Sequence, residues 1–158
     1  LDYECELAVV LGRDARDVPA GQTRDYIFGY TILNDVSARD VQTAHKQWYF
    51  GKSLDGFTPI GPCIVTADAF ADYPPRLGIR SFVNGEKRQD SNTALQIFDI
   101  DHVIAELSQG MTLKAGTIIA TGTPAGVGMG MDPPQFLKPG DVVRCEIEGI
   151  GTLTNPVK

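Results

Sequence analysis

The chain has 158 residues, 42% of them hydrophobic and 22% charged, which is typical of one globular domain with a sizeable core. Its net charge of −6 and the lack of a Lys/Arg cluster argue against a protein built to bind nucleic acid. No apolar run approaches the roughly 20 residues of a membrane helix. Cys5, Cys63 and Cys145 form no Cys-x-x-Cys pair, so we expect a reducing, cytoplasmic environment without a disulfide framework.

The first half of the chain predicts, in order, a strand over residues 4–11, a loop over 14–23, a strand over 28–33, a helix over 37–48, a turn over 59–62 and a short strand over 63–66. The strands are rich in aliphatic and aromatic residues, whereas the loop carries Gly, Pro and Asp. Ser37 is of the residue type that caps helix N-termini, so it marks the expected start of the helix.

The second half predicts strands over 77–83 and 86–89, a helix that begins at Asp99 or Asp101 and ends at Gly110, and two glycine turns that each lead into a strand, over 113–119 and 137–143. Asn84-Gly85 between the first two strands is typical of a type I′ hairpin. The helix should bury Val103, Ile104 and Leu107. Because most strands follow one another without a helix between them, we predict an α+β, mostly β domain with antiparallel strands.

Three acidic residues form the first candidate site. Glu4 and Glu6 lie two apart in an expected strand, so their side chains share a face while Cys5 points the other way. Asp35 follows the next strand and is a candidate third ligand. Oxygen ligands of this kind suit a hard divalent cation. On the residues alone, a solvent-facing strand edge for the glutamates and a helix cap for Asp35 are the simpler interpretations.

Three nitrogen-bearing side chains are candidates for substrate contacts. Arg39 and Gln42 lie three apart on the expected helix, where Arg39 could bind a carboxylate through two parallel hydrogen bonds and Gln42 could orient a carbonyl. Lys52 lies in a predicted loop. Its charge would neutralise three carboxylates and one divalent cation, and a buried site tolerates a neutral cluster best. Solvated roles for all three side chains remain open.

The glycine-rich run at 122–130 is a further candidate for ligand contact. Its glycines match neither the dinucleotide-binding nor the Walker spacing, and no helical pattern follows. A tight loop that lets the backbone approach a ligand is the better interpretation, with Thr123 as a hydrogen-bonding residue. Of the two histidines, His45 could point at the same cleft as Gln42, although a surface position is the simpler interpretation. His102 has no expected role.

Four motifs occur in an order that resembles the catalytic C-terminal domain of the fumarylacetoacetate hydrolase family: DYECE at 2–6, NDVSARDVQ at 34–42, GKSLDGFTPIGP at 51–62 and TGTPAGVG at 121–128. The likeness continues to GIGTLTNPV at 149–157 and so covers nearly the whole chain. It implies a mixed β-sheet roll with a few short helices, usually found as a homodimer.

The resemblance also implies the roles of individual residues. A Mg²⁺ or Mn²⁺ ion would be held by Glu4, Glu6 and Asp35. The substrate, a small dicarbonyl or 2-oxo acid, would be contacted by Arg39, Gln42, Lys52 and Thr123. Lys52 would be catalytic, because together with the metal it would stabilise an enolate. Hydrolysis also needs a base that activates water.

The activity that the resemblance favours is metal-dependent hydrolysis of a C–C bond in a 2,4-dioxo acid of the acylpyruvate or fumarylpyruvate type. In smaller members of the family a His/Glu pair on an upstream lid often supplies the base. This chain begins at Leu1 directly in a strand pattern, so we expect a single catalytic domain over residues 1–158 that lacks the lid. Alternatives are oxaloacetate decarboxylation, isomerisation or tautomerisation of a 2-hydroxydienoate, ureidoglycolate lyase-type activity and, in another class, a non-catalytic metal-dependent binding module.

Overall fold

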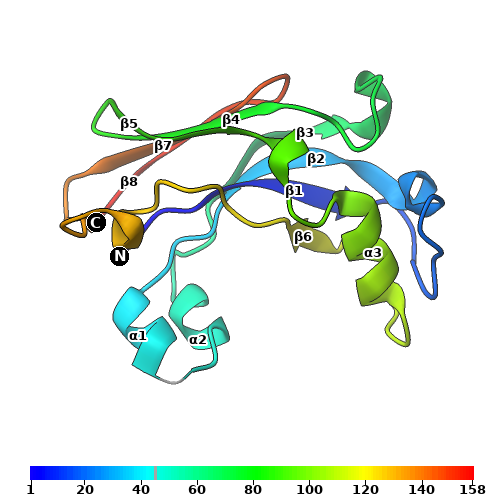
Figure 1. Cartoon of the computed structure of the whole chain (residues 1–158), viewed down its shortest axis with the longest axis horizontal. Helices are drawn as coiled ribbons and strands as arrows, with labels where there is room; N and C mark the ends of the chain where they lie inside the picture. Colours follow the sequence, from blue (N-terminus) through cyan, green and yellow to red (C-terminus); the bar gives the residue numbers. More distant parts are fainter. Residues whose placement is uncertain (45) are drawn as a thin grey trace.

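The computed structural model describes residues 1–44 and 46–158, which form two four-stranded sheets with the strand orders β3-β2-β1-β6 and β5-β4-β7-β8. The strands are β1 (Cys5–Leu11), β2 (Ile27–Asn34), β3 (Ile60–Thr66), β4 (Gly78–Val83), β5 (Glu86–Asn92), β6 (Ile118–Ala120), β7 (Val142–Ile147) and β8 (Gly151–Pro156). Neighbouring strands are antiparallel in both sheets, and the sheets lie as two stacked layers (Figure 1). The prediction of an α+β, mostly β domain is confirmed.

Short helices lie at the two ends of the stacked sheets. The α-helices are α1 (Arg39–Ala44), α2 (Tyr49–Lys52) and α3 (Ile100–Ser108), and the 3-10 turns are η1 (Thr23–Tyr26), η2 (Ala67–Ala69), η3 (Thr93–Leu95) and η4 (Gly128–Gly130). Figure 1 shows α1 and α2 together below the end that carries the N-terminus, and α3 at the opposite end. Among the described residues, no helix has both the length and the apolar character needed to cross a bilayer.

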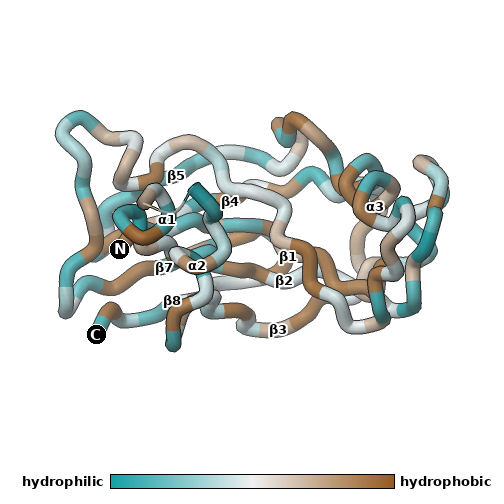
Figure 2. Tube along the Cα trace, turned by 90° about the horizontal axis from the view of Figure 1, so that it is seen from below, coloured by the Kyte–Doolittle hydropathy of each residue, from teal (hydrophilic) through white to brown (hydrophobic). Residues whose placement is uncertain are grey.

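The hydrophobic core fills the space between the sheets. Cys5, Leu7 and Val9 alternate along β1 and point into it, where they join residues such as Ile79 and Ile147 of the second sheet. Side chains alternate along a strand, so Glu4 and Glu6 point away from this core. Figure 2 shows hydrophobic stretches along the central strands and more hydrophilic ones in the connecting loops.

The second half of the chain follows its predicted turn chemistry closely. Asn84 and Gly85 both have positive φ, 51° and 84°, as a type I′ hairpin requires. Asp99 caps α3 by accepting a hydrogen bond from His102 N at 2.8 Å, and Gly110 has a φ of 72° just beyond the helix. Leu107, however, is 39% exposed, so its prediction as a buried residue was wrong.

The helix predicted over 37–48 is shorter in the structure, where α1 spans Arg39–Ala44, and a separate helix, α2, follows the predicted range. Ser37 forms an isolated bridge with Asp2 instead of capping a helix, and Lys52 ends α2 instead of lying in a loop. A Cβ on Gly51 would lie 2.6 Å from Gln42 N, so only glycine lets α2 pack this closely against α1. His45, for which a position near Gln42 was considered, lies outside the described residues.

Candidate metal and substrate site

The start of β1 and the end of β2 bring the three predicted metal ligands together. Cys5 pairs with Asn34, and Asp35 N donates to Glu4 O at 2.9 Å, so the backbone holds the two segments side by side. Glu4, Glu6 and Asp35 each have one carboxylate oxygen within 4.8 Å of the other two. The interpretation of Glu4 and Glu6 as solvent-facing acids is wrong, since they are 9% and 3% exposed.

Lys52 lies within the acidic cluster, at the end of α2. Its Nζ donates to Asp35 Oδ2 at 2.5 Å, to Glu4 Oε2 at 2.9 Å and to Ser37 Oγ at 2.9 Å, which uses all three ammonium hydrogens. Burial alone would lower the pKa of Lys52, but the hydrogen bonds to Asp35 and Glu4 outweigh it and raise the pKa. Lys52 is therefore a charged, fully hydrogen-bonded part of the site, and a solvated role for it is excluded.

Arg39 and Gln42 also contact the cluster, from α1. Arg39 Nε lies 2.9 Å from Asp2 Oδ2, and its Nη1 lies 2.7 Å from Glu4 Oε1 and 3.0 Å from Gln42 Oε1. Burial would lower the pKa of Arg39, but the partnership with Asp2 and Glu4 raises it. Both side chains are buried, so the shared helix face that the sequence predicted is directed into the site and not toward solvent.

Of the carboxylates in the cluster, Glu6 has the fewest interactions that offset its negative charge. Its Oε2 accepts a 2.7 Å hydrogen bond from Gly122 N, where a φ of 94° turns the glycine-rich loop toward β1. Burial raises the pKa of Glu6 to about 7, because the Gly122 hydrogen bond and the Lys52 charge do not offset burial and the nearby charges of Asp35 and Glu4. Among the described residues, the Glu6 carboxylate therefore forms no ion pair with a positive side chain.

The donor set meets the requirements of a divalent cation. Among the described residues, four carboxylates meet here, on Asp2, Glu4, Glu6 and Asp35. Arg39 and Lys52 form ion pairs with three of them and none with Glu6, which leaves a formal charge of −2. Buried charge of one sign is costly, and one divalent cation would neutralise it. The ligating atoms available are carboxylate oxygens, which Mg²⁺ and Mn²⁺ prefer.

Thr123 lies beside this cluster but is held by other residues. Its Oγ1 donates to Cys5 O at 3.0 Å and accepts from Gln89 Nε2 at 2.7 Å. Gln89 Nε2 also donates to Pro124 O at 2.7 Å. The loop that carries Thr123 is thereby fixed against β1 between the two glutamates.

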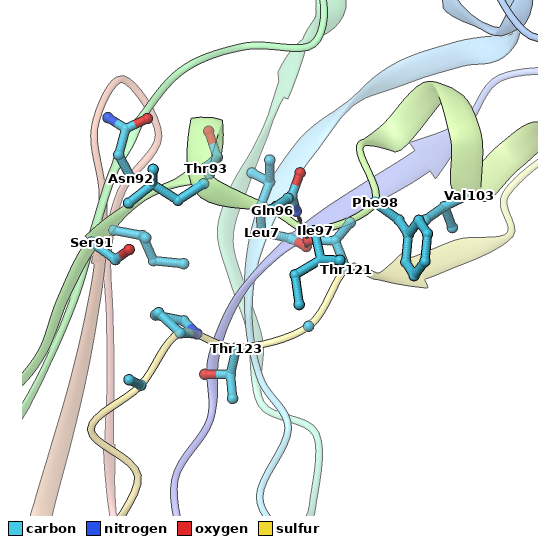
Figure 3. Close-up of a pocket in the computed structure, with 15 residues that line it drawn as sticks. Leu7, Ser91, Asn92, Thr93, Gln96, Ile97, Phe98, Val103, Thr121 and Thr123 are labelled. Atoms are coloured by element: carbon cyan, nitrogen blue, oxygen red, sulfur yellow. Dashed lines mark hydrogen bonds between the residues drawn. The ribbon is translucent and has the colours of Figure 1, made fainter.

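A cavity of about 480 Å³ lies across this loop from the acidic cluster. Gly122 and Thr123 border both, but the cavity is bordered by Leu7, which points away from Glu6 on β1, and none of its lining residues is charged. Figure 3 shows Thr93, Gln96 and Ile97 on one side of the cavity and Thr123 on the other. The loop over 121–125 thus separates an apolar cavity from a charged site.

Sequence reasoning assigned no individual role at the site to four of its residues: Asp2, Ser37, Gln89 and Gly122. Asp2 belongs to the DYECE motif and Gly122 to TGTPAGVG, so their position in the motifs was an available signal. Ser37 was interpreted as a cap. Gln89 lies in a charged hairpin strand, and nothing in the local pattern distinguishes it, although it is completely buried. No role was predicted for His102. In the structure it lies in α3, away from the cluster, and its ring stacks on that of Phe98.

Comparison with known proteins agrees with these motifs. A family model described as the fumarylacetoacetate (FAA) hydrolase C-terminal domain matches residues 1–158. The chain is similar to a Bacillus subtilis protein named oxaloacetate tautomerase YisK, with 50% identity over 157 residues, which cover 99% of this chain and 52% of the relative. The chain therefore spans about half the length of the curated relatives it matches.

Solved structures show the same likeness. A fumarylacetoacetate hydrolase from Exiguobacterium antarcticum superimposes with a TM-score of 0.96 and 53% identity, over 100% of this chain and 56% of that one. A 5-carboxymethyl-2-hydroxymuconate delta-isomerase from Mycobacterium smegmatis superimposes with a TM-score of 0.88 and 47% identity, over 98% of this chain and 58% of that one. The relatives therefore carry names of more than one reaction type.

Proposed function

We propose that this chain, which belongs to the fumarylacetoacetate hydrolase family, is a metal-dependent tautomerase or isomerase of small 2-oxo acids. In such a reaction a proton leaves the carbon next to the 2-oxo group and a proton is added elsewhere on the conjugated system, with no C–C bond broken. Two of the similar proteins are named for this chemistry, an oxaloacetate tautomerase and a hydroxymuconate delta-isomerase. That support places isomerisation ahead of the hydrolysis expected from the motifs.

The observation that carries the proposal is a pair of unused hydrogen-bond donors beside the acidic cluster. Within the described part of the chain, Arg39 Nη2 and Gln42 Nε2 make no hydrogen bond, although the rest of each side chain is fixed. Arg39 Nη1 holds Gln42 Oε1, so the amide is oriented with its N–H₂ away from Arg39. Two such donors suit the carboxylate or oxo oxygens of a 2-oxo acid.

Glu4, Glu6 and Asp35 would hold the Mg²⁺ or Mn²⁺ ion. When bound, the ion supplies a Lewis acid that polarises the 2-oxo group of the substrate. Arg39 and Gln42 would orient the substrate carboxylate, and Thr123 would offer a hydroxyl, which donates to Cys5 O in this structure. These residues fix the substrate so that the bond to the acidic hydrogen is held in one orientation.

Lys52 would contribute positive charge next to the oxygen that gains electron density. All three of its donors are used by the protein, so a direct hydrogen bond to substrate requires the exchange of one partner. Ser37 is the neutral acceptor, whereas Glu4 and Asp35 are carboxylates, and an ammonium is attracted more strongly to a carboxylate than to a hydroxyl. We infer that the substrate oxygen replaces Ser37 on Lys52 Nζ.

The experiment that tests the proposal measures the rates of three reactions with the same protein, with Mg²⁺ and then with EDTA. Keto–enol interconversion of oxaloacetate, pyruvate formed from oxaloacetate, and pyruvate formed from acetylpyruvate report tautomerisation, decarboxylation and hydrolysis respectively. We expect metal-dependent tautomerisation as the fastest of the three. Pyruvate formed faster than the enol equilibrates would contradict the proposal, and metal binding without any turnover would favour the non-catalytic alternative.

Hydrolysis of a 2,4-dioxo acid is the second candidate. It is favoured by the 53% identity to a structure named as a fumarylacetoacetate hydrolase. Such a reaction needs a base that activates water in addition to the metal and Lys52. Metal-dependent release of pyruvate from acetylpyruvate, faster than tautomerisation of oxaloacetate, would establish it.

The expected homodimer stays a prediction. Ile60, Ile64 and Ile118 on β3 and β6 are 43%, 47% and 47% exposed. Ile60 pairs with Leu33 and Ile118 pairs with Val10, on the face of the first sheet that points away from the core. We propose this apolar face as the contact between two copies.

A further inference from the structure

At the start of β1, next to the two glutamates, side chains from other segments occupy the strand edge where a neighbouring strand would otherwise pair. β6 pairs with β1 only from Ala8 to Val10. At Cys5, the backbone N–H donates to Gln89 Oε1 at 3.2 Å and the backbone C=O accepts from Thr123 Oγ1 at 3.0 Å. A side-chain amide and a hydroxyl therefore complete the edge of the strand between Glu4 and Glu6.

Gln89 comes from β5 in the other sheet and is completely buried. Its Oε1 accepts from Cys5 N and from Ser81 Oγ, and its Nε2 donates to Thr123 Oγ1 and Pro124 O, all between 2.7 and 3.2 Å. An amide has two donor hydrogens and two acceptor lone pairs, so the hydrogen-bonding capacity of Gln89 is fully used. A side chain so constrained cannot rotate its amide without losing several buried hydrogen bonds.

This arrangement fixes the polarity of the Thr123 hydroxyl. Because Gln89 Nε2 donates to Thr123 Oγ1, the single hydroxyl hydrogen must point elsewhere. The hydroxyl hydrogen points to Cys5 O, beside the glutamates, where a ligand oxygen can compete for it. With Gln89 in place, Thr123 is a donor toward the site.

We propose that Gln89 is a positioning residue, which acts through Thr123 by forcing its hydroxyl to donate toward an anionic ligand in the metal site. The inference rests on the proposed function, because it requires an oxygen-rich ligand beside Glu4 and Glu6. Gln89 lines neither the acidic cluster nor the cavity across the loop, so its action on a ligand is indirect.

The test is a double-mutant cycle with oxalate as the probe and Mn²⁺ as the metal, read by calorimetry. Gln89→Met keeps the length of the side chain and removes its four hydrogen bonds. We expect oxalate affinity of the Mn²⁺-loaded protein to fall about tenfold, and by less than about twofold when Thr123→Val is already present. Affinity for Mn²⁺ itself should change by less than about threefold.

Gln89→Glu is the second variant and covers the case in which Gln89→Met does not fold. It keeps the acceptor for Cys5 N and Ser81 Oγ but removes both N–H donors, so the Thr123 hydrogen would turn to the new carboxylate. Oxalate affinity should then fall further than with Gln89→Met. Ser108→Ala is the matched control, since Ser108 is also completely buried and hydrogen-bonded, to Val18 N and Ala105 O. It should lower the unfolding temperature without changing oxalate affinity.

The outcomes separate this inference from the proposed function. If the parent protein binds neither Mn²⁺ nor oxalate, both are overturned. If the parent binds both, but Gln89→Met and Gln89→Glu bind oxalate as the parent does, only the positioning role is overturned. An equal loss of oxalate affinity with and without Thr123→Val would overturn it too, because Gln89 would then not act through Thr123.

Discussion

The two faces of β1 are both buried, but by opposite means. Toward the core, Cys5, Leu7 and Val9 are completely buried among apolar side chains of both sheets. On the other face, Glu4 and Glu6 are surrounded by Arg39 and Lys52, by the Gly122 N–H and by a third carboxylate. One face needs only shape complementarity, whereas the other needs charge balance, which the described side chains leave incomplete.

The difference teaches where stability and function come from in this fold. Apolar contacts stabilise the strand without any ligand, since burial of apolar area is favourable in itself. The charged face contributes little net stability, because desolvation of its ions offsets their attraction. It is therefore the face on which a substitution can remove function while the fold remains.

The largest effect on stability should come from the core face. Leu7→Ala should lower the free energy of unfolding by about 2–5 kcal/mol, through lost burial and the cavity left behind. Denaturant unfolding measures it. Leu107→Ala, at an exposed position of α3, is the matched control with a cost below about 1 kcal/mol. Mn²⁺ affinity of the folded variant should stay within a few-fold of the parent. A large loss of metal affinity would break the separation of the two faces.

The second effect should come from the charged face, and it should lower activity without lowering stability. Glu6→Gln should reduce metal-dependent turnover at least about 100-fold, more than the loss typical of residues that only support a ligand. In EDTA, its unfolding temperature should equal or exceed that of the parent, because a buried carboxylate without a positive partner has been removed. Mn²⁺ titration and thermal unfolding measure both quantities. Retention of full metal-dependent activity would remove Glu6 from the site.

The smallest effect should come from the neutral member of the charged face. Ser37→Ala removes the hydroxyl that accepts from Lys52 Nζ and donates to Asp35 O. We expect a loss of about 1 kcal/mol in unfolding free energy, typical of one hydrogen bond. KM for the oxo acid should change by less than about threefold, since the substrate replaces Ser37 on Lys52. A tenfold rise in KM would mean that Ser37 itself binds substrate.

Local sequence patterns predicted much of this fold, because turns, helix caps and strand faces depend on residues that are close together in the chain. Asn84-Gly85 fixed a hairpin, Asp99 capped a helix, and alternation placed Glu4 and Glu6 on one face of β1. The prediction of a helix over 37–48 failed for a non-local reason, because Asp2 pairs with Ser37 and α2 packs back on α1 at Gly51. Such contacts leave no periodic trace in the sequence.

The composition and the four motifs by themselves determined the family, the fold class and the three carboxylates, Glu4, Glu6 and Asp35, that meet in the acidic cluster. Only the tertiary structure decided how these residues are connected. It paired Asp2 with Arg39, used all three donors of Lys52 and brought Gln89 from the second sheet to Cys5 and Thr123. The physical reason is that charge balance and hydrogen-bond saturation depend on distances between segments far apart in the chain, whereas turns and alternation depend on neighbours.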